Sequence, residues 1–93
     1  MTAALSPTDR PRLRRGVRTG TDPLSDRPIL LFPEGILFLN DTAAAVIGHC
    51  DGSRTVADVM QTIDAIYDGV DGNDIITLVQ DLVAQRLMVV DRG

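Results

Sequence analysis

The sequence predicts a small α+β domain, winged helix-turn-helix-like, with an N-terminal β-hairpin or three-stranded sheet packed on three helices. The chain has 93 residues, too few for two separate cores. Two short apolar runs flank Glu34-Gly35, and three amphipathic segments with tight turns follow them. Only two Phe and one Tyr are present among the apolar residues, so the core must be built from aliphatic side chains.

The first fifteen residues are expected to form a flexible, arginine-rich arm, and residues 16–93 a single domain. Residues 1–15 contain prolines and arginines without apolar periodicity, so they cannot bury enough surface to hold themselves in place. A short extended piece is expected at Val17-Arg18. The Gly, Asp, Pro and Ser residues over 20–26 then predict a loop.

Two strands are expected at residues 29–32 and 36–39, joined by a turn at Glu34-Gly35. Each run has four consecutive apolar residues, which is too short for a helix. Both runs are apolar on both faces, whereas a solvated antiparallel sheet normally alternates. Something must therefore cover the second face or edge: helices of the same chain, a second copy or a bound peptide.

Three helices separated by short turns are expected after the hairpin, and residues 87–90 are expected to form a final strand. Each helix begins at a side chain that can accept a hydrogen bond from a backbone N–H of the first turn. The first two end near Asp51-Gly52 and Asp68-Gly69, because glycine readily takes the left-handed conformation that ends a helix. The expected caps are Asn40, Thr55 with Asp58, and Asp71 or Asn73.

Charge is unevenly distributed along the chain. Residues 1–27 hold six arginines and three acids, or +3, and residues 28–93 hold three arginines and ten acids, or −7. The main alternative function is winged-helix DNA binding, but a recognition helix should carry basic or amide side chains toward the DNA. The acidic folded part opposes phosphate contacts, so no nucleic-acid partner is expected. The arginines of the arm could instead steer an acidic partner.

The chain is not expected to be an enzyme, and neither a metal site nor a cofactor is expected. It has one histidine, one cysteine and one glutamate, and the adjacent His49 and Cys50 point in different directions. Cys50 is interpreted as a small buried hydrophobe. No apolar run is long enough to span a membrane, and the single cysteine fits a reducing compartment, so a cytoplasmic protein is expected.

Several short motifs have a specific spacing: Leu30-Leu31-Phe32-Pro33-Glu34-Gly35, Leu39-Asn40, Ala43-Ala44, Cys50-Asp51-Gly52 and Thr55-Val56. Over about residues 11–90 the chain resembles the PqqD family of pyrroloquinoline quinone biosynthesis. The resemblance implies a peptide chaperone that binds the ribosomal precursor PqqA and presents it to the radical S-adenosylmethionine enzyme PqqE. It also implies a recognition element for modified ribosomal peptides, which holds the leader peptide as an added strand beside the third strand and along the third helix. The chain departs from the family pattern in the loop of residues 19–25 and at Arg86, where glycine is common.

The strand over residues 36–39 is the expected peptide-binding edge, because an edge strand offers unpaired backbone groups to an extended peptide. The third helix has an apolar arc wider than a core stripe needs. The sequence does not decide which strand face lines the groove, so Ile36 and Phe38 are alternatives to Leu37 and Leu39. A homodimer paired through the same edge is a further alternative. The expected peptide-binding residues are Leu37, Leu39, Ile76, Val79, Val83 and Arg86.

Overall fold

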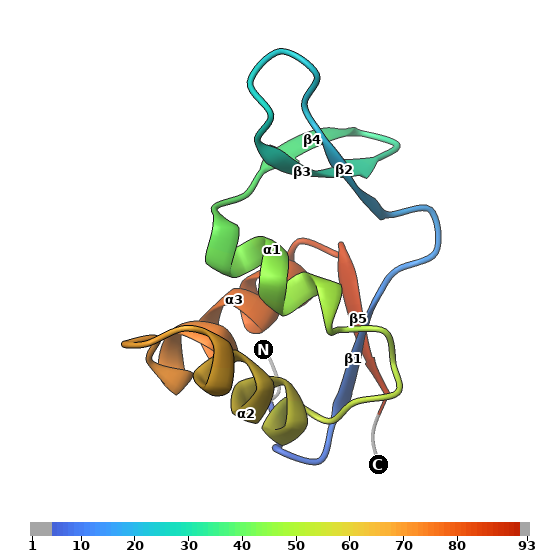
Figure 1. The fold of residues 1–93 in the computed structure, drawn as a ribbon. Helices are drawn as coiled ribbons and strands as arrows, with labels where there is room; N and C mark the ends of the chain where they lie inside the picture. Colours follow the sequence, from blue (N-terminus) through green and yellow to red (C-terminus); the bar gives the residue numbers. More distant parts are fainter. Residues whose placement is uncertain (1–4, 92–93) are drawn as a thin grey trace.

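The computed structural model describes residues 5–91, in which five strands and three helices follow one another along the chain (Figure 1). These elements are β1 (Arg10–Leu13), β2 (Arg18–Thr21), β3 (Pro28–Phe32), β4 (Gly35–Phe38), α1 (Asp41–Gly48), α2 (Val56–Ile66), α3 (Gly72–Ala84) and β5 (Met88–Asp91).

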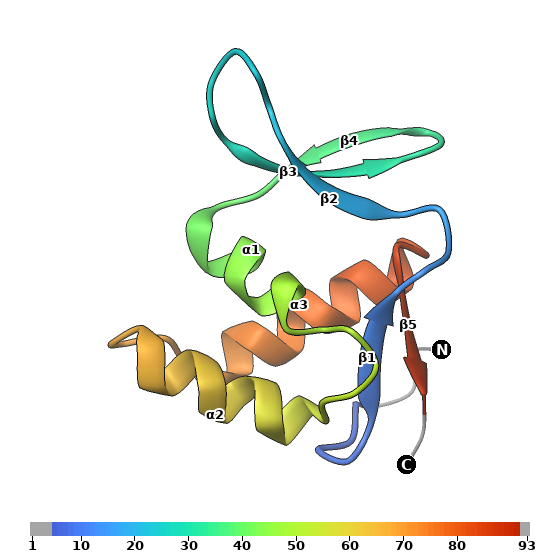
Figure 2. The ribbon, with the colours of Figure 1, turned by 45° about the vertical axis from the view of Figure 1, so that its right-hand side comes forward.

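Two antiparallel sheets lie on different sides of the helices. The first has the strand order β2-β3-β4, and the second consists of β1 and β5. In Figures 1 and 2 the three-stranded sheet lies above α1 and α3, while the β1–β5 ribbon runs beside the helices. The α+β class with three helices and an N-terminal antiparallel sheet is confirmed.

The expected hairpin forms, with its two-residue turn one position earlier than the expected Glu34-Gly35. β3 and β4 are joined by Pro33-Glu34, with Phe32 opposite Gly35 and Leu30 opposite Leu37. β2 extends further than the expected piece at Val17-Arg18 and pairs with β3 as far as Thr21 opposite Pro28. The sheet therefore has three strands, and β4 is at its edge.

Local hydrogen bonds explain where the helices begin. The Asn40 side chain accepts from the N–H of Ala43 at 2.7 Å, and Thr55 and Asp58 form the reciprocal capping box. Asp71, one of the two expected candidates, caps α3. α1 ends earlier than expected, at Gly48, and Asp51 forms a β-bridge with Arg12 instead.

The segment before β2 is part of the fold, which corrects the expectation of a mobile arm for residues 5–13. β1 pairs with β5 over its whole length. The carbonyls of Asp9 and Pro7 accept from the N–H groups of Val56 and Ala57 at 2.8 and 3.1 Å. These amides belong to the first turn of α2 and have no partner within the helix. Residues 1–4 lie outside the described residues, so the expectation for them stays a prediction.

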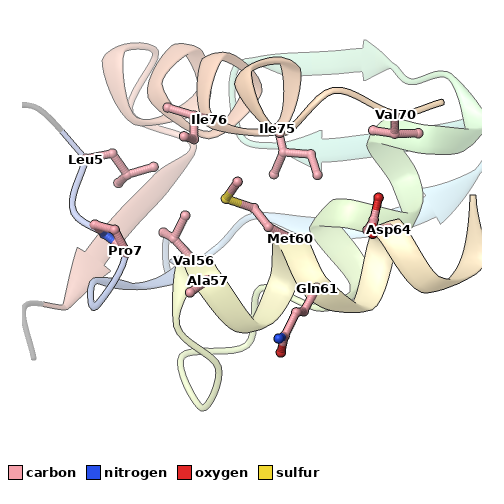
Figure 3. Close-up of a pocket in the computed structure, with 11 residues that line it drawn as sticks. Leu5, Pro7, Val56, Ala57, Met60, Gln61, Asp64, Val70, Ile75 and Ile76 are labelled. Carbon is pink, nitrogen blue, oxygen red and sulfur yellow. The ribbon is translucent and has the colours of Figure 1, made fainter. Parts of the chain in front are cut away.

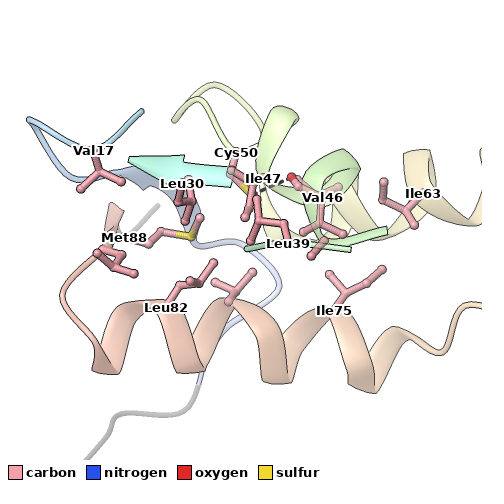
Figure 4. Packing of buried hydrophobic residues seen from close by; sticks show 14 residues of the cluster. Val17, Leu30, Leu39, Val46, Ile47, Cys50, Ile63, Ile75, Leu82 and Met88 are labelled. Carbon is pink, nitrogen blue, oxygen red and sulfur yellow. Dashed lines mark hydrogen bonds between the residues drawn. The ribbon is translucent and has the colours of Figure 1, made fainter. Parts of the chain in front are cut away.

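The core lies between the three-stranded sheet and the helices. Leu30 of β3, Val46 of α1 and Ile63 of α2 have no exposed surface, and Leu82 of α3 is 1% exposed. Figure 4 shows α3 passing below Leu30 and Leu39, with its apolar face turned toward them. Cys50 joins this cluster, as expected of a small buried hydrophobe.

Candidate functional site: a strand edge beside α3

The outer edge of β4 offers backbone groups for pairing. Within residues 5–91, β4 pairs with β3 and with no other strand. The N–H of Leu39, directly after β4, donates to the carbonyl of Pro28 at 2.9 Å. Along an antiparallel pair, residues whose backbone groups bond to the neighbouring strand alternate with residues whose groups point away from it. The N–H and C=O groups of Leu37 therefore also face β3. The N–H and C=O groups of Ile36 and Phe38 therefore point toward the open edge.

The side chains of β4 alternate between two faces. Leu37 is half-buried and packs against the core, and Leu39 is buried in it. Ile36 and Phe38 are 55% and 49% exposed on the outer face, where the Arg27 guanidinium lies 5.0 Å from the centre of the Phe38 ring. The helix side of the edge thus carries Leu37, and the outer side carries Ile36 and Phe38.

A cleft lies beside α3 close to the end of β4. Its volume is about 330 Å³, and Asn40, Thr42 and Val46 line it together with Asp74 and Leu78 of α3. Asn40 comes two residues after β4, so the cleft lies near the end of that strand, and its other lining residues come from α1, from α3 and from Val70. It combines an apolar wall, which includes the half-buried Leu78, with the carboxylate of Asp74 at its rim.

Four of the six residues expected to bind the peptide, Leu37, Leu39, Val79 and Val83, belong to the core cluster or pack against it. Val79 and Leu39 are 1% and 4% exposed and belong to the core, and Val83 is half-buried against it. Ile76 lines another cavity, on the flank of α3 opposite to Leu78. Of the five apolar residues, only Leu37 lies at the open edge, and any peptide contact by these residues stays a prediction.

Sequence reasoning missed the flank of α3 that carries Asp74 and Leu78. Apolar residues extend to both sides of the core stripe, with Ile76 and Val83 on one side and Leu78 on the other. Which side lines the cleft depends on how α3 packs against α1, and helical periodicity alone does not determine that packing. The outward backbone groups of Ile36 and Phe38, by contrast, follow from the two-residue turn and the alternation of an antiparallel pair.

Arg86, the sixth expected residue, is exposed at the end of α3. Its backbone has a φ of 62°, in the left-handed region. The N–H of Arg86 donates to the carbonyl of Val83 at 3.0 Å, and that of Leu87 to Leu82 at 2.9 Å. These two bonds form a Schellman motif, in which glycine is the usual residue at this position.

The Cys50 thiol is buried and keeps its proton at neutral pH. The Cys50 thiol donates to the Val46 carbonyl at 3.1 Å. Burial, and to a smaller extent the charge of Asp51, raises the pKa of this thiol to about 12. Within residues 5–91 no group of three or more His, Cys, Asp or Glu side chains could hold a metal ion. No helix in the same range is long and apolar enough to cross a membrane.

Comparisons with known sequences point to one family. The family model of coenzyme PQQ synthesis protein D (PqqD) matches residues 28–88. The PqqA binding protein of Azotobacter vinelandii is 41% identical over 64 residues, 69% of this chain and 70% of that protein. The PqqA binding protein of Stutzerimonas stutzeri is 36% identical over 85 residues, 91% of this chain and 87% of that protein.

Two solved structures have a similar fold. One is the PqqD truncation of Methylobacterium extorquens PqqCD, a functional and stand-alone recognition element for ribosomally synthesized and post-translationally modified peptides. It is 36% identical, with a TM-score of 0.77, over 95% of this chain and 96% of that one. The other is the heterocyclase TruD, with a TM-score of 0.66 at 13% identity, covering 88% of this chain and 11% of TruD. This second likeness concerns the fold alone.

Proposed function

This chain belongs to the PqqD family, and from that premise we propose that it is a non-catalytic peptide chaperone in pyrroloquinoline quinone biosynthesis. It binds the ribosomal precursor PqqA and presents it to the radical S-adenosylmethionine enzyme PqqE, in the cytoplasm, where ribosomal peptides are made. The observation that carries the proposal is the open edge of β4, with the cleft lined by Leu78 near the end of that strand.

The precursor adds a strand to β4 in this proposal. Its backbone pairs with the outward N–H and C=O groups of Ile36 and Phe38, about four hydrogen bonds with a net contribution on the order of 1 kcal/mol each. Micromolar affinity needs about 8 kcal/mol. Side chains of the precursor must therefore supply the rest, through contacts with Leu37 and with Leu78 in the cleft.

Charge and exposure favour a peptide over DNA as the ligand. Residues 55–85 include α2 and α3 and contain six aspartates but no lysine, arginine or histidine. The helix that would enter a major groove exposes Asp74, Thr77 and Asp81. These carboxylates oppose contact with phosphate groups. Homodimerisation through β4 is the second candidate, because the same open edge would serve it.

The added-strand proposal is tested at Ile36 by isothermal titration calorimetry with PqqA. Ile36→Pro removes the outward N–H, which an edge strand tolerates because that group faces solvent. We expect the affinity to fall about tenfold or more, since a hydrogen bond is lost and the ring obstructs the incoming strand. Ile36→Ala keeps the N–H and is the matched control. Equal affinities of the two variants would contradict backbone pairing at β4.

The same titration tests the cleft with two variants of α3. Leu78→Asp puts a charge at the wall beside Asp74, and we expect about tenfold weaker PqqA binding. Ile76→Asp makes the same change on the opposite flank and should leave the affinity within about twofold. The reverse result would assign the peptide to the flank of Ile76.

Sedimentation measurements with and without PqqA test the alternative of a homodimer, because a peptide that occupies β4 must compete with self-association through the same edge.

A further inference from the structure

A second and larger cavity, of about 560 Å³, lies between α2, α3 and the segment before β1 (Figure 3). Its walls are mostly apolar and include Leu5, Pro7, Val56 and Ile76. In Figure 3 the Met60 side chain of α2 points across the cavity toward α3. No residue of β2, β3 or β4 lines it, so a ligand here leaves the edge of β4 free.

The wall of this cavity can adapt to a large side chain. Gly72 has no side chain, and a Cβ atom built there would lie only 2.6 Å from Cε of Met60. The Met60 side chain therefore packs directly against the backbone of Gly72. Methionine is flexible and polarizable, and it fills gaps of different shapes. Ala57, which is exposed at the rim, leaves the entrance open. The cavity therefore suits one inserted aliphatic or aromatic side chain.

The charge around the cavity determines which class of ligand can bind there. Asp64 lines the cavity and is exposed; the two bordering helices carry four aspartates and no basic residue, and two further aspartates lie in the segment that connects them. An acidic peptide, a nucleic acid or an anionic lipid surface would be repelled here. The complementary ligand is a protein segment with one large apolar side chain flanked by lysine or arginine.

We propose that this cavity is the docking site of the enzyme that modifies the bound peptide, and that a basic segment of the enzyme inserts an apolar side chain between α2 and α3. The inference rests on the proposed function, because it assigns the partner to which the precursor is presented. Val70 and Ile75 line both this cavity and the cleft near the end of β4. An enzyme held here would therefore lie close to the bound precursor, which raises its effective concentration.

The test measures binding of the PqqE holoenzyme to the full chain by biolayer interferometry. Asp64→Lys reverses a charge at the rim, and Ala57→Arg adds a cation and obstructs the entrance. Each should weaken PqqE binding about tenfold or more. Asp81→Lys makes the same charge change at an exposed position of α3 that lines neither cavity, and its effect should stay within about threefold. PqqA affinity, measured by calorimetry, should be unchanged in Asp64→Lys and Ala57→Arg.

Each other outcome has a separate meaning. If PqqE binds both cavity variants as it binds the wild-type chain, or does not bind the wild-type chain at all, while PqqA still binds, the docking inference is overturned and peptide binding stands. If the wild-type chain does not bind PqqA, the proposed function fails instead. Self-association that Asp64→Lys abolishes would identify a second copy as the occupant and also overturn the inference. Circular dichroism verifies that the variants are folded.

Discussion

Arg86 combines a conformational cost with an exposed positive charge. A residue with a Cβ atom in the left-handed region is less stable than glycine there, because Cβ approaches the following carbonyl. The chain nevertheless has arginine at the position that closes α3.

Replacing Arg86 separates these two roles. Arg86→Gly should stabilise the protein by about 0.5–1 kcal/mol, because it removes the strain at a φ of 62°. Arg86→Ala keeps the Cβ atom and should give no such gain. Urea unfolding followed by circular dichroism measures the difference. If the side chain contacts PqqA, both variants lose the same affinity in calorimetry; equal stability of the two variants would contradict the conformational argument.

The buried Cys50 thiol should lower the stability of the fold at alkaline pH. Its pKa is raised from an ordinary value of 9.0 to about 12, mainly by burial. Between these values the unfolded chain loses the thiol proton while the folded chain keeps it. The free energy of unfolding should therefore fall as pH rises above about 9, by up to roughly 1.4 kcal/mol per pH unit. Urea titrations at pH 7, 9 and 10 measure this, and Cys50→Ala, which has no thiol, should lack that component. Parallel curves for the two proteins would rule the effect out.

At the level of single elements, the parts of the fold that follow from short-range chemistry could be predicted from the sequence. The hairpin follows from two apolar runs around a two-residue turn, and α1 and α2 begin at the expected caps, Asn40 and Thr55. In these cases the residues that decide the structure lie within about four positions of one another. The expected end of α1 was wrong: α1 ends at Gly48, and Asp51-Gly52 pairs with β1 instead.

The elements that were missed depend on partners far along the chain. β1 contains two arginines and a proline, and it becomes a strand because β5 pairs with it. No local periodicity signals such a strand. The flank of α3 that lines the cleft was likewise not predicted, since it depends on how α3 packs against α1. The candidate site was therefore predictable as a strand edge, but its helical wall was not.

For the whole molecule, charge divides the surface into two regions. Arginines follow β1 and β2, and two of them form exposed ion pairs: Arg12 with Asp91 at 2.9 Å, and Arg14 with Glu34 at 3.9 Å. The region of α2 and α3 carries only acids. Such exposed pairs add little stability, so this distribution matters more for the choice and orientation of partners. Two partners of different charge can then occupy the two ends of the molecule.

For the whole molecule, residues 5–13 connect β5 with the start of α2, and their removal tests this structural role against the steering role expected for the arm. Deleting residues 1–13 removes the partner of β5, the carbonyls that cap α2 and the buried ring of Pro11. Two lost hydrogen bonds and one buried side chain already cost about 3 kcal/mol, a large part of the stability of a small domain. Urea unfolding should show a much lower midpoint or no folded state. Arg10→Ala combined with Arg12→Ala keeps the backbone of β1 and should change stability by less than about 1 kcal/mol. A truncated chain with the wild-type midpoint would mean that β1 contributes nothing to the fold and that the segment acts only through its charge.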